Sequence, residues 1–314
     1  MRTTLALWTV AFVAPLSFAG VTLTNSTALA VEGAMSPYLK GATAFMAGVL
    51  PPHPGTYFTN LYYHYDGDAG ANVRNGVVEL GVDMSLDLYA LQGLFVTDAK
   101  ILGGTYAFGA LVDYAWADLS ATIDGPLGPR AVAIDNSGIG DSFVWPFFLG
   151  WHADNFHFNV NMGVLLPTGE YEPGQLNLSK NVWALMPQVA VTYFDPESGL
   201  DISAAFTYVT MWRNDVTDYQ SGDIVHLDWA IGLHLGAWEI GVAGNVVQQI
   251  EGDSGTGARL GSFKAQSWGL GPAINFNTKI GEMPLVLQAR WQHDFDVKNT
   301  FEGDVVVASA TLFF

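Results

Sequence analysis

Residues 225–243 read VHLDWAIGLHLGAWEIGVA, with apolar and polar side chains alternating along the segment. Large apolar residues such as Val225, Leu227 and Trp229 take every second position, and polar residues such as His226 and Asp228 take the others. A period of two places one set of side chains on each face of a β-strand. The pattern pauses only at 236–237, which is the length of a tight hairpin turn. One apolar face and one polar face are typical of membrane-spanning strands of a β-barrel, greasy outside and wet inside.

The same alternation recurs from about residue 56 to the end of the chain. We count twelve such segments, the last placing Val306, Ala308, Ala310, Leu312 and Phe314 on one face. The connections alternate in length, with long ones expected at about 66–76, 120–140, 167–181, 213–223 and 250–264 and short ones between them. Bacterial barrels have short periplasmic turns, longer external loops and an even strand number. The sequence therefore predicts an all-β fold, a transmembrane antiparallel β-barrel of about 12 strands in the bacterial outer membrane.

Composition agrees with this fold and excludes other classes of protein. Half of the 314 residues are hydrophobic, yet after the N-terminus no apolar run reaches the 18 or so residues that a spanning helix needs. The net charge of −18 argues against nucleic-acid binding. The chain has no cysteine, which excludes disulfides, a zinc ribbon and a lipoprotein anchor. No dinucleotide or phosphate-loop motif indicates a cofactor. The expected partners are outer-membrane lipid and a small solute. The sequence does not indicate an oligomeric state.

The N-terminal 54 residues differ from the rest of the chain. Arg2 and the apolar run from about residue 5 to 19 resemble a secretory signal, and the small residues at 28–30 favour cleavage after Ala30 over cleavage after Ala19. Residues 31–54 contain the segment PPHP at 51–54, and prolines remove the donors that a strand ladder needs. We expect a signal peptide over 1–30, a non-barrel leader over 31–54, in the lumen or at the periplasmic mouth, and the barrel over 55–314.

Side chains on the expected inward faces define a candidate solute path. Glu79, Asp83 and Asp87 recur at four-residue intervals and would form an acidic stripe facing Arg290 across the lumen. The alternative is a satisfied polar network that only fills the barrel. The predicted path residues are Glu79, Asp83, Asp87, Asp113, His157, Asn159, Asn161, His226, Asp228 and Arg290.

Histidines near acidic residues raise two further possibilities. A barrel hydrolase could use His226 with Asp228, or His293 with its neighbour Asp294, but no serine is in an evident partner position. A metal site could use His226, Asp228 and His234, but His234 lies about 20 Å from Asp228 along a strand, so a ligand from a neighbouring strand would be needed. We therefore predict neither a catalytic residue nor a metal ligand.

Several short motifs are spread from about residue 45 to the end of the chain. They include PPHPGTY at 51–57, VTDAKILGG at 96–104, GIGD at 138–141, PFFLGW at 146–151, LPTGEY at 166–171 and TDYQSG at 217–222. Their order and spacing resemble the outer-membrane proteins of the meta-pathway of phenol degradation family, also called SphA-like proteins. This resemblance implies a barrel associated with uptake of aromatic or other hydrophobic compounds, and it carries no assigned binding residue.

Three functions are compatible with this sequence. The first is an outer-membrane channel, not an enzyme, that passively admits a small hydrophobic or aromatic solute through the lumen or a lateral gap. The second is a structural or adhesive barrel whose external loops bind a partner. The third is an outer-membrane hydrolase, which would lose activity on substitution of His226 or His293.

Overall fold

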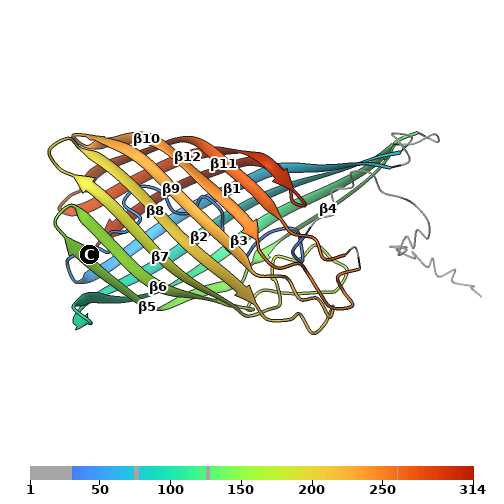
Figure 1. Ribbon diagram of the computed structural model, residues 1–314, viewed down its shortest axis with the longest axis horizontal. Helices are drawn as coiled ribbons and strands as arrows, with labels where there is room; N and C mark the ends of the chain where they lie inside the picture. Colours follow the sequence, from blue (N-terminus) through green and yellow to red (C-terminus); the bar gives the residue numbers. More distant parts are fainter. Residues whose placement is uncertain (1–29, 74–77, 125–127, 260) are drawn as a thin grey trace, which may run out of the picture.

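The computed structural model describes residues 30–314 except 74–77, 125–127 and 260. The predicted signal peptide therefore lies almost entirely outside the described residues. The described residues form thirteen antiparallel strands (Figure 1). They are β1 (Gly55–Val73), β2 (Val78–Ile101), β3 (Gly104–Asp124), β4 (Arg130–Ile139), β5 (Ser142–Ala153), β6 (Phe156–Leu166), β7 (Ala184–Asp195), β8 (Leu200–Met211), β9 (Ile224–Leu235), β10 (Trp238–Gln249), β11 (Gln266–Ile280), β12 (Met283–Lys298) and β13 (Glu302–Phe313).

The sheet closes on itself because its first and last strands pair. Tyr57 faces Phe313 and the register continues to Asp68 opposite Glu302. β4 and β5 together occupy a single position in the ring, since β5 pairs with the first half of β3 and β4 pairs with its second half. The result is the predicted closed barrel of twelve antiparallel strands. Within the described residues, no helix is long and apolar enough to cross a membrane.

The β9–β10 hairpin shows how the alternating sequence makes the wall. The two strands pair from Trp238 opposite Leu235, and Gly236 turns the chain with a φ of 69°, a left-handed value that suits glycine. Leu227, Ile231 and Leu233 are exposed on the outside of the barrel, as predicted. Contiguous apolar surface of this kind marks contact with lipid.

The two ends of the barrel differ as predicted, with tight turns at one end and long connections at the other (Figure 1). Two predicted loops are strands instead. β1 and β2 stay paired as far as Val73 opposite Val78, and β3 and β4 pair as far as Ile123 opposite Arg130. These extensions project beyond the rest of the barrel wall (Figure 1). Both faces of a projecting hairpin can meet water, so its polar residues do not prevent pairing.

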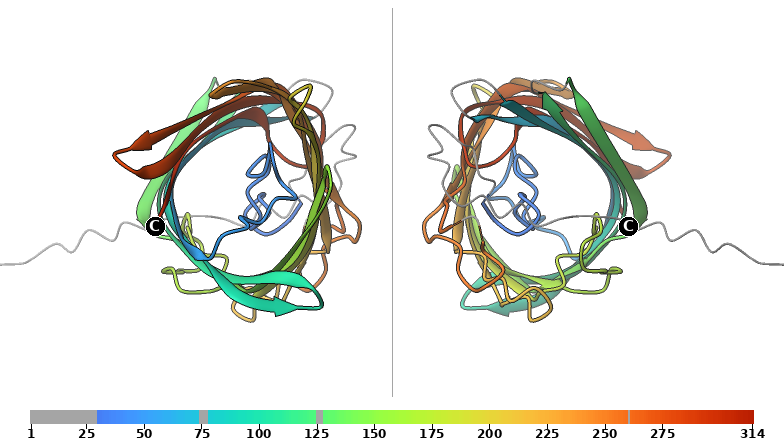
Figure 2. Two further views of the ribbon diagram at one scale, coloured as in Figure 1. Left: turned by 90° about the vertical axis from the view of Figure 1, so that its left-hand side faces the viewer. Right: turned by 90° about the vertical axis from the view of Figure 1, so that its right-hand side faces the viewer.

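The leader lies inside the barrel. Figure 2 shows residues 30–54 within the ring of strands, close to one side of it. Ala30 donates a hydrogen bond to the Asn299 carbonyl oxygen in the connection between β12 and β13, at the long-loop end, and Leu50 lies against Gly150 near the short-turn end. Phe45 packs against Ala230, Ala243 and Ala273, small side chains that leave room for it on the inner wall. The leader therefore fills one side of the lumen and leaves the opposite side free.

Candidate functional site

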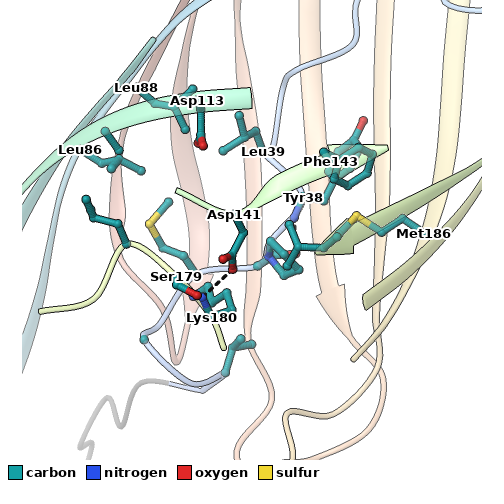
Figure 3. Close-up of a pocket in the computed structure, with 18 of the residues that line it drawn as sticks. Tyr38, Leu39, Leu86, Leu88, Asp113, Asp141, Phe143, Ser179, Lys180 and Met186 are labelled. Atoms are coloured by element: carbon teal, nitrogen blue, oxygen red, sulfur yellow. Dashed lines mark hydrogen bonds between the residues drawn. The ribbon is translucent and has the colours of Figure 1, made fainter. Parts of the chain in front are cut away.

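A cavity of about 900 Å³ lies between the leader and the wall formed by β2, β3 and β5. Its wall is mainly apolar, and Figure 3 shows Leu86, Leu88, Phe143 and Met186 around it. Ligand sites of small organic molecules are typically clefts of 300–1,000 Å³ with mostly apolar walls and a few polar groups. The cavity therefore has the size and the lining of a site for a small apolar molecule.

The apolar lining comes from a strand whose orientation is opposite to our prediction. Met84, Leu86 and Leu88 of β2 face the cavity, and Asp83 and Asp87 face outward. Asp87 accepts hydrogen bonds outside the barrel from the Tyr62 hydroxyl and pairs with His64. The predicted lumen orientation of Asp83 and Asp87 is wrong, because the rule of a greasy outside and a wet inside fails where the lumen itself is apolar.

The acidic stripe that we predicted across the lumen from Arg290 is therefore absent from the described part of β2. Glu79 belongs to β2 and pairs with Asp124 of β3 through the backbone. Its side chain lies outside the described part of the structure.

A polar group interrupts the apolar lining of the cavity. Asp113 of β3 faces the cavity, as predicted, and Asp141 lies between Asp113 and Lys180 (Figure 3). Asp141 is held by the backbone N–H groups of Gly169 and Lys180, at 3.1 and 2.7 Å. The buried Oδ1 of Asp113 has no hydrogen-bond partner among the described residues. A buried acceptor without a partner is costly, so a donor group on a bound molecule would be stabilised there.

Lys180 contributes the positive charge of this group. Its ammonium donates a hydrogen bond to the Glu32 carbonyl oxygen at 2.9 Å, linking the loop between β6 and β7 to the leader. Burial lowers the pKa of Lys180 to about 8, although the charges of Glu32 and Asp141 partly oppose that shift.

The opposite wall of the lumen is polar and holds the leader. The Asp228 carboxylate accepts a hydrogen bond from the Tyr38 hydroxyl at 2.7 Å and from the backbone N–H groups of Gly41 and Thr43 at 3.0 and 3.2 Å. Arg290 donates to the carbonyl oxygens of Gly41 and Ala42. Asp228 and Arg290 face inward as predicted, but they bind the chain's own leader and not an open water-filled path.

Ion pairing adds to this attachment. The Lys40 ammonium of the leader forms a salt bridge with the fully buried Asp294 of β12. Burial lowers the pKa of Lys40 and the nearby Asp294 opposes that shift. Burying a charge is tolerated when it is paired. The pair therefore fixes the middle of the leader against β12.

Of the three predicted residues of β6, two line the cavity and the third does not. Asn159 and Asn161 are buried and line the cavity, and Asn159 also donates a hydrogen bond to the leader carbonyl of Ala47 at 2.9 Å. His157 lies near the β5–β6 turn, where its ring contacts His152, and it does not contribute to the cavity lining.

The structure also supplies the serine that the sequence did not reveal. His226 Nε2 lies 2.9 Å from the hydroxyl of Ser36 in the leader, a contact between residues 190 positions apart. The Nδ1 atom of His226 has no hydrogen-bond partner among the described residues, and Asp228 is engaged by the leader instead. A hydrolytic triad requires an acid that orients the histidine through this nitrogen. The serine and histidine therefore lack that third member.

This closed twelve-stranded barrel, apolar outside and holding an internal leader, belongs to the class of bacterial outer-membrane β-barrel proteins. The chain is a member of the family described as "Putative MetA-pathway of phenol degradation", whose model matches residues 65–310. The match covers most of the barrel and confirms the family resemblance of the sequence motifs. No curated protein matches the chain.

Solved structures share the barrel architecture. The COG4313 outer membrane channel from Pseudomonas putida F1 superimposes with a TM-score of 0.61 at 15% identity, covering 85% of this chain and 97% of the channel. The β domain of the Bordetella autotransporter BrkA superimposes with a TM-score of 0.47 at 9% identity, covering 83% of this chain and 100% of the β domain. A Pseudomonas aeruginosa FadL homologue superimposes with a TM-score of 0.40 at 12% identity, covering 82% of this chain and 88% of the homologue. At 15% identity the similarity to the COG4313 channel concerns the fold alone.

Proposed function

We propose that this protein is a passive outer-membrane channel for small apolar compounds, aromatic ones included. The single observation that carries the proposal is the cavity of about 900 Å³ with an apolar wall inside an outer-membrane barrel. The interior of such barrels is ordinarily polar. An apolar lumen wall loses its unfavourable contact with water when an apolar solute covers it.

The cavity also has the extent that a route requires. Its lining includes Leu176 and Arg259 from the long connections at one end, and Leu50 near the start of β1 at the other. Leu50 lies against Gly150 near the short-turn end of β5, where an added Cβ atom would be 2.5 Å from the Leu50 Cβ atom. A solute that enters between the external loops would therefore travel along the leader toward the short-turn end.

Asp113 and Lys180 suggest which apolar compounds fit best. They place hydrogen-bonding groups in the lining of a cavity that is otherwise mostly apolar. A small ring or chain with one hydroxyl or amino group matches both the apolar and the polar lining. Its apolar portion would cover the leucines, and its hydroxyl or amino group would donate a hydrogen bond to Asp113. Family membership agrees with this class of solute.

Transport into proteoliposomes tests the proposal. Leu86→Trp narrows the cavity, and Leu91→Trp places the same side chain on the outward face of the same strand, where Leu91 is exposed. Uptake of a radiolabelled phenol should fall several-fold in the first variant and stay at the wild-type rate in the second. Circular dichroism of both variants would show whether the barrel is formed. Equal uptake by the two folded variants would contradict the cavity as the route.

One observation favours the second function, a barrel that binds a partner through its external parts. All but one of the residues of β4 are exposed, and β4 pairs with β3 alone among the described strands. An open strand edge can accept a further strand from another chain. If the open edge of β4 binds a partner, deletion of residues 120–133, which removes the paired ends of β3 and β4 together with their connection, would abolish partner binding or adhesion. The channel proposal predicts that the deletion leaves phenol uptake unchanged.

A further inference from the structure

Three side chains from three adjacent strands converge at the short-turn end of the barrel. They are Asp201 at the start of β8, His234 near the end of β9 and Glu239 at the start of β10. One donor atom from each lies within 4.8 Å of the other two. The closest approach joins His234 Nε2 to Glu239 Oε1, at 3.1 Å. None of the three belongs to the cavity described above.

The pairing of the strands explains this convergence. His234 and Glu239 are direct partners in the β9–β10 ladder, so their side chains share the inner face. Asp201 is opposite Gly232 of β9, two positions before His234 and therefore on the same face of the sheet. A Cβ atom on Gly232 would lie 2.9 Å from Glu239 Oε1. The missing side chain at 232 therefore lets the carboxylates of β8 and β10 meet across the intervening strand.

The environment of these groups calls for a positive charge. Asp201 is fully buried and Glu239 is 1% exposed. Neither forms an ion pair with a lysine or arginine among the described residues. Glu239 Oε1 and His234 Nε2 are 3.1 Å apart without forming a hydrogen bond, and neither atom has a hydrogen-bond partner elsewhere among the described residues. Two buried carboxylates in contact are unfavourable unless a proton or a cation neutralises them.

We propose that Asp201, His234 and Glu239 bind one divalent transition-metal ion of the Zn²⁺ class. An imidazole nitrogen with two carboxylate oxygens suits Zn²⁺, whereas Ca²⁺ and Mg²⁺ prefer oxygen ligands alone. Ligands at about 2 Å from a tetrahedral ion are roughly 3.3 Å apart, so small side-chain rotations close the 4.8 Å span. His234 is partly exposed, which gives an ion access and leaves the fourth position to water.

Neighbouring groups already orient two of the three ligands. Asn275 donates a hydrogen bond to Glu239 Oε2 at 3.0 Å, which leaves Oε1 free for the ion. The Ser203 hydroxyl donates to Asp201 Oδ1 at 2.6 Å. Metal ligands are usually fixed in this way by an outer shell of hydrogen bonds.

The site is also connected to the leader. Asp201 Oδ2 accepts the backbone N–H of Met46 at 2.8 Å, and the ring of Phe45 packs where the Gly232 side chain would be. A bound ion would hold Asp201 in place and relieve the repulsion between the carboxylates. Metal binding should therefore strengthen the docking of the leader at residues 44–48.

Titration of metal-free, refolded protein in detergent with Zn²⁺ tests the site, with calorimetry as the readout. The test variants are His234→Ala and Glu239→Gln. The matched control is His293→Ala, which removes a histidine from an exposed pair with Asp304, 3.1 Å apart. We expect one equivalent of Zn²⁺ in the wild type and the control. In the test variants the affinity should fall at least about 100-fold, since loss of an outer-shell partner alone costs 10–100-fold.

Two further measurements keep the test decisive if a variant folds poorly. The visible spectrum of the wild type with Co²⁺ should show the intense bands of a four- or five-coordinate ion. Hydrogen exchange at residues 44–48 should slow when Zn²⁺ is added to the wild type and should not change in Glu239→Gln. Absence of stoichiometric Zn²⁺ binding in the wild type, or equal binding by wild type and His234→Ala, would overturn the proposal, and both results leave the channel function standing.

Discussion

The Tyr38 hydroxyl donates a hydrogen bond to the Asp228 carboxylate at 2.7 Å, joining the leader to a barrel strand 190 positions later in the chain. Asp228 is almost completely buried, and its remaining hydrogen bonds also come from the leader. The leader, which this wall carboxylate holds, thus occupies the space that water would otherwise fill on this side of the lumen. Docking of the leader against Asp228 therefore fills one side of the lumen and leaves the cavity on the side of β2, β3 and β5.

Asp228→Asn should loosen the leader. The substitution removes the charge and turns part of the acceptor into a donor that faces the N–H groups of Gly41 and Thr43. Hydrogen bonds to charged groups contribute about 1.5–3 kcal/mol each, so we expect at least a tenfold acceleration of hydrogen exchange at residues 38–43. The single-channel conductance in planar bilayers should rise for the same reason. Asp87→Asn, on the outward face, should change neither quantity, and identical behaviour of the two variants would refute the role of Asp228.

Gly48→Ala should displace the part of the leader nearest β6 and β7. A Cβ atom at residue 48 would lie 2.4 Å from both the His157 carbonyl oxygen and the Thr192 backbone nitrogen. These are backbone atoms of the wall, so the leader has to move instead. Limited proteolysis should cut the leader of Gly48→Ala several-fold faster than that of Gly81→Ala, where no atom lies within 4 Å of the added group. Equal cleavage rates would show that the leader is not held closely there.

Asp113→Leu should alter which solutes the cavity prefers. The wild type offers an unpartnered acceptor to a solute hydroxyl, and the variant offers an apolar surface of similar size. Removing one hydrogen bond of about 1.4 kcal/mol changes an affinity tenfold. We expect the affinity for phenol to fall about tenfold relative to that for toluene, measured by competition with a fluorescent apolar probe. A ratio that stays constant would place the solute hydroxyl elsewhere.

Lys180 should titrate with a pKa of about 8, in the connection between β6 and β7. NMR of protein with ¹³C-methylated lysines measures this directly, and Lys180→Arg identifies the resonance. Because the folded-state pKa is below the ordinary value of 10.5, the unfolded chain binds more protons between these values. The free energy of unfolding should therefore rise from about pH 8 to pH 10.5 in the wild type more than in Lys180→Met. A Lys180 resonance that titrates with the exposed lysines would contradict its burial.

The architecture was predictable where lipid imposes one simple pattern. His226 and Asp228 alternate with large apolar residues, and the inward direction predicted for them is correct. The same rule gave the wrong direction for Asp83 and Asp87, because Leu86 and Leu88 also alternate with them and are inside. Alternation alone identifies two faces, and it does not say which one meets lipid when the lumen is apolar.

Contacts between distant segments were beyond the reach of the sequence. Ser36 next to His226 depends on the path of the leader, which no local pattern encodes. The convergence of Asp201 with Glu239 depends on the register of three strands and on the absence of a side chain at Gly232. A shift of one residue in either pairing would turn these side chains to opposite faces.

Binding of 4-iodophenol in crystals, located by the anomalous scattering of iodine, tests the cavity most directly. The channel proposal predicts iodine between the leader and the wall of β2, β3 and β5, near Leu86 and Phe143, with the hydroxyl toward Asp113. Leu86→Trp should remove this peak. Iodine bound only on the lipid-facing surface, or no iodine at all in a well-ordered barrel, would contradict a solute site in this cavity.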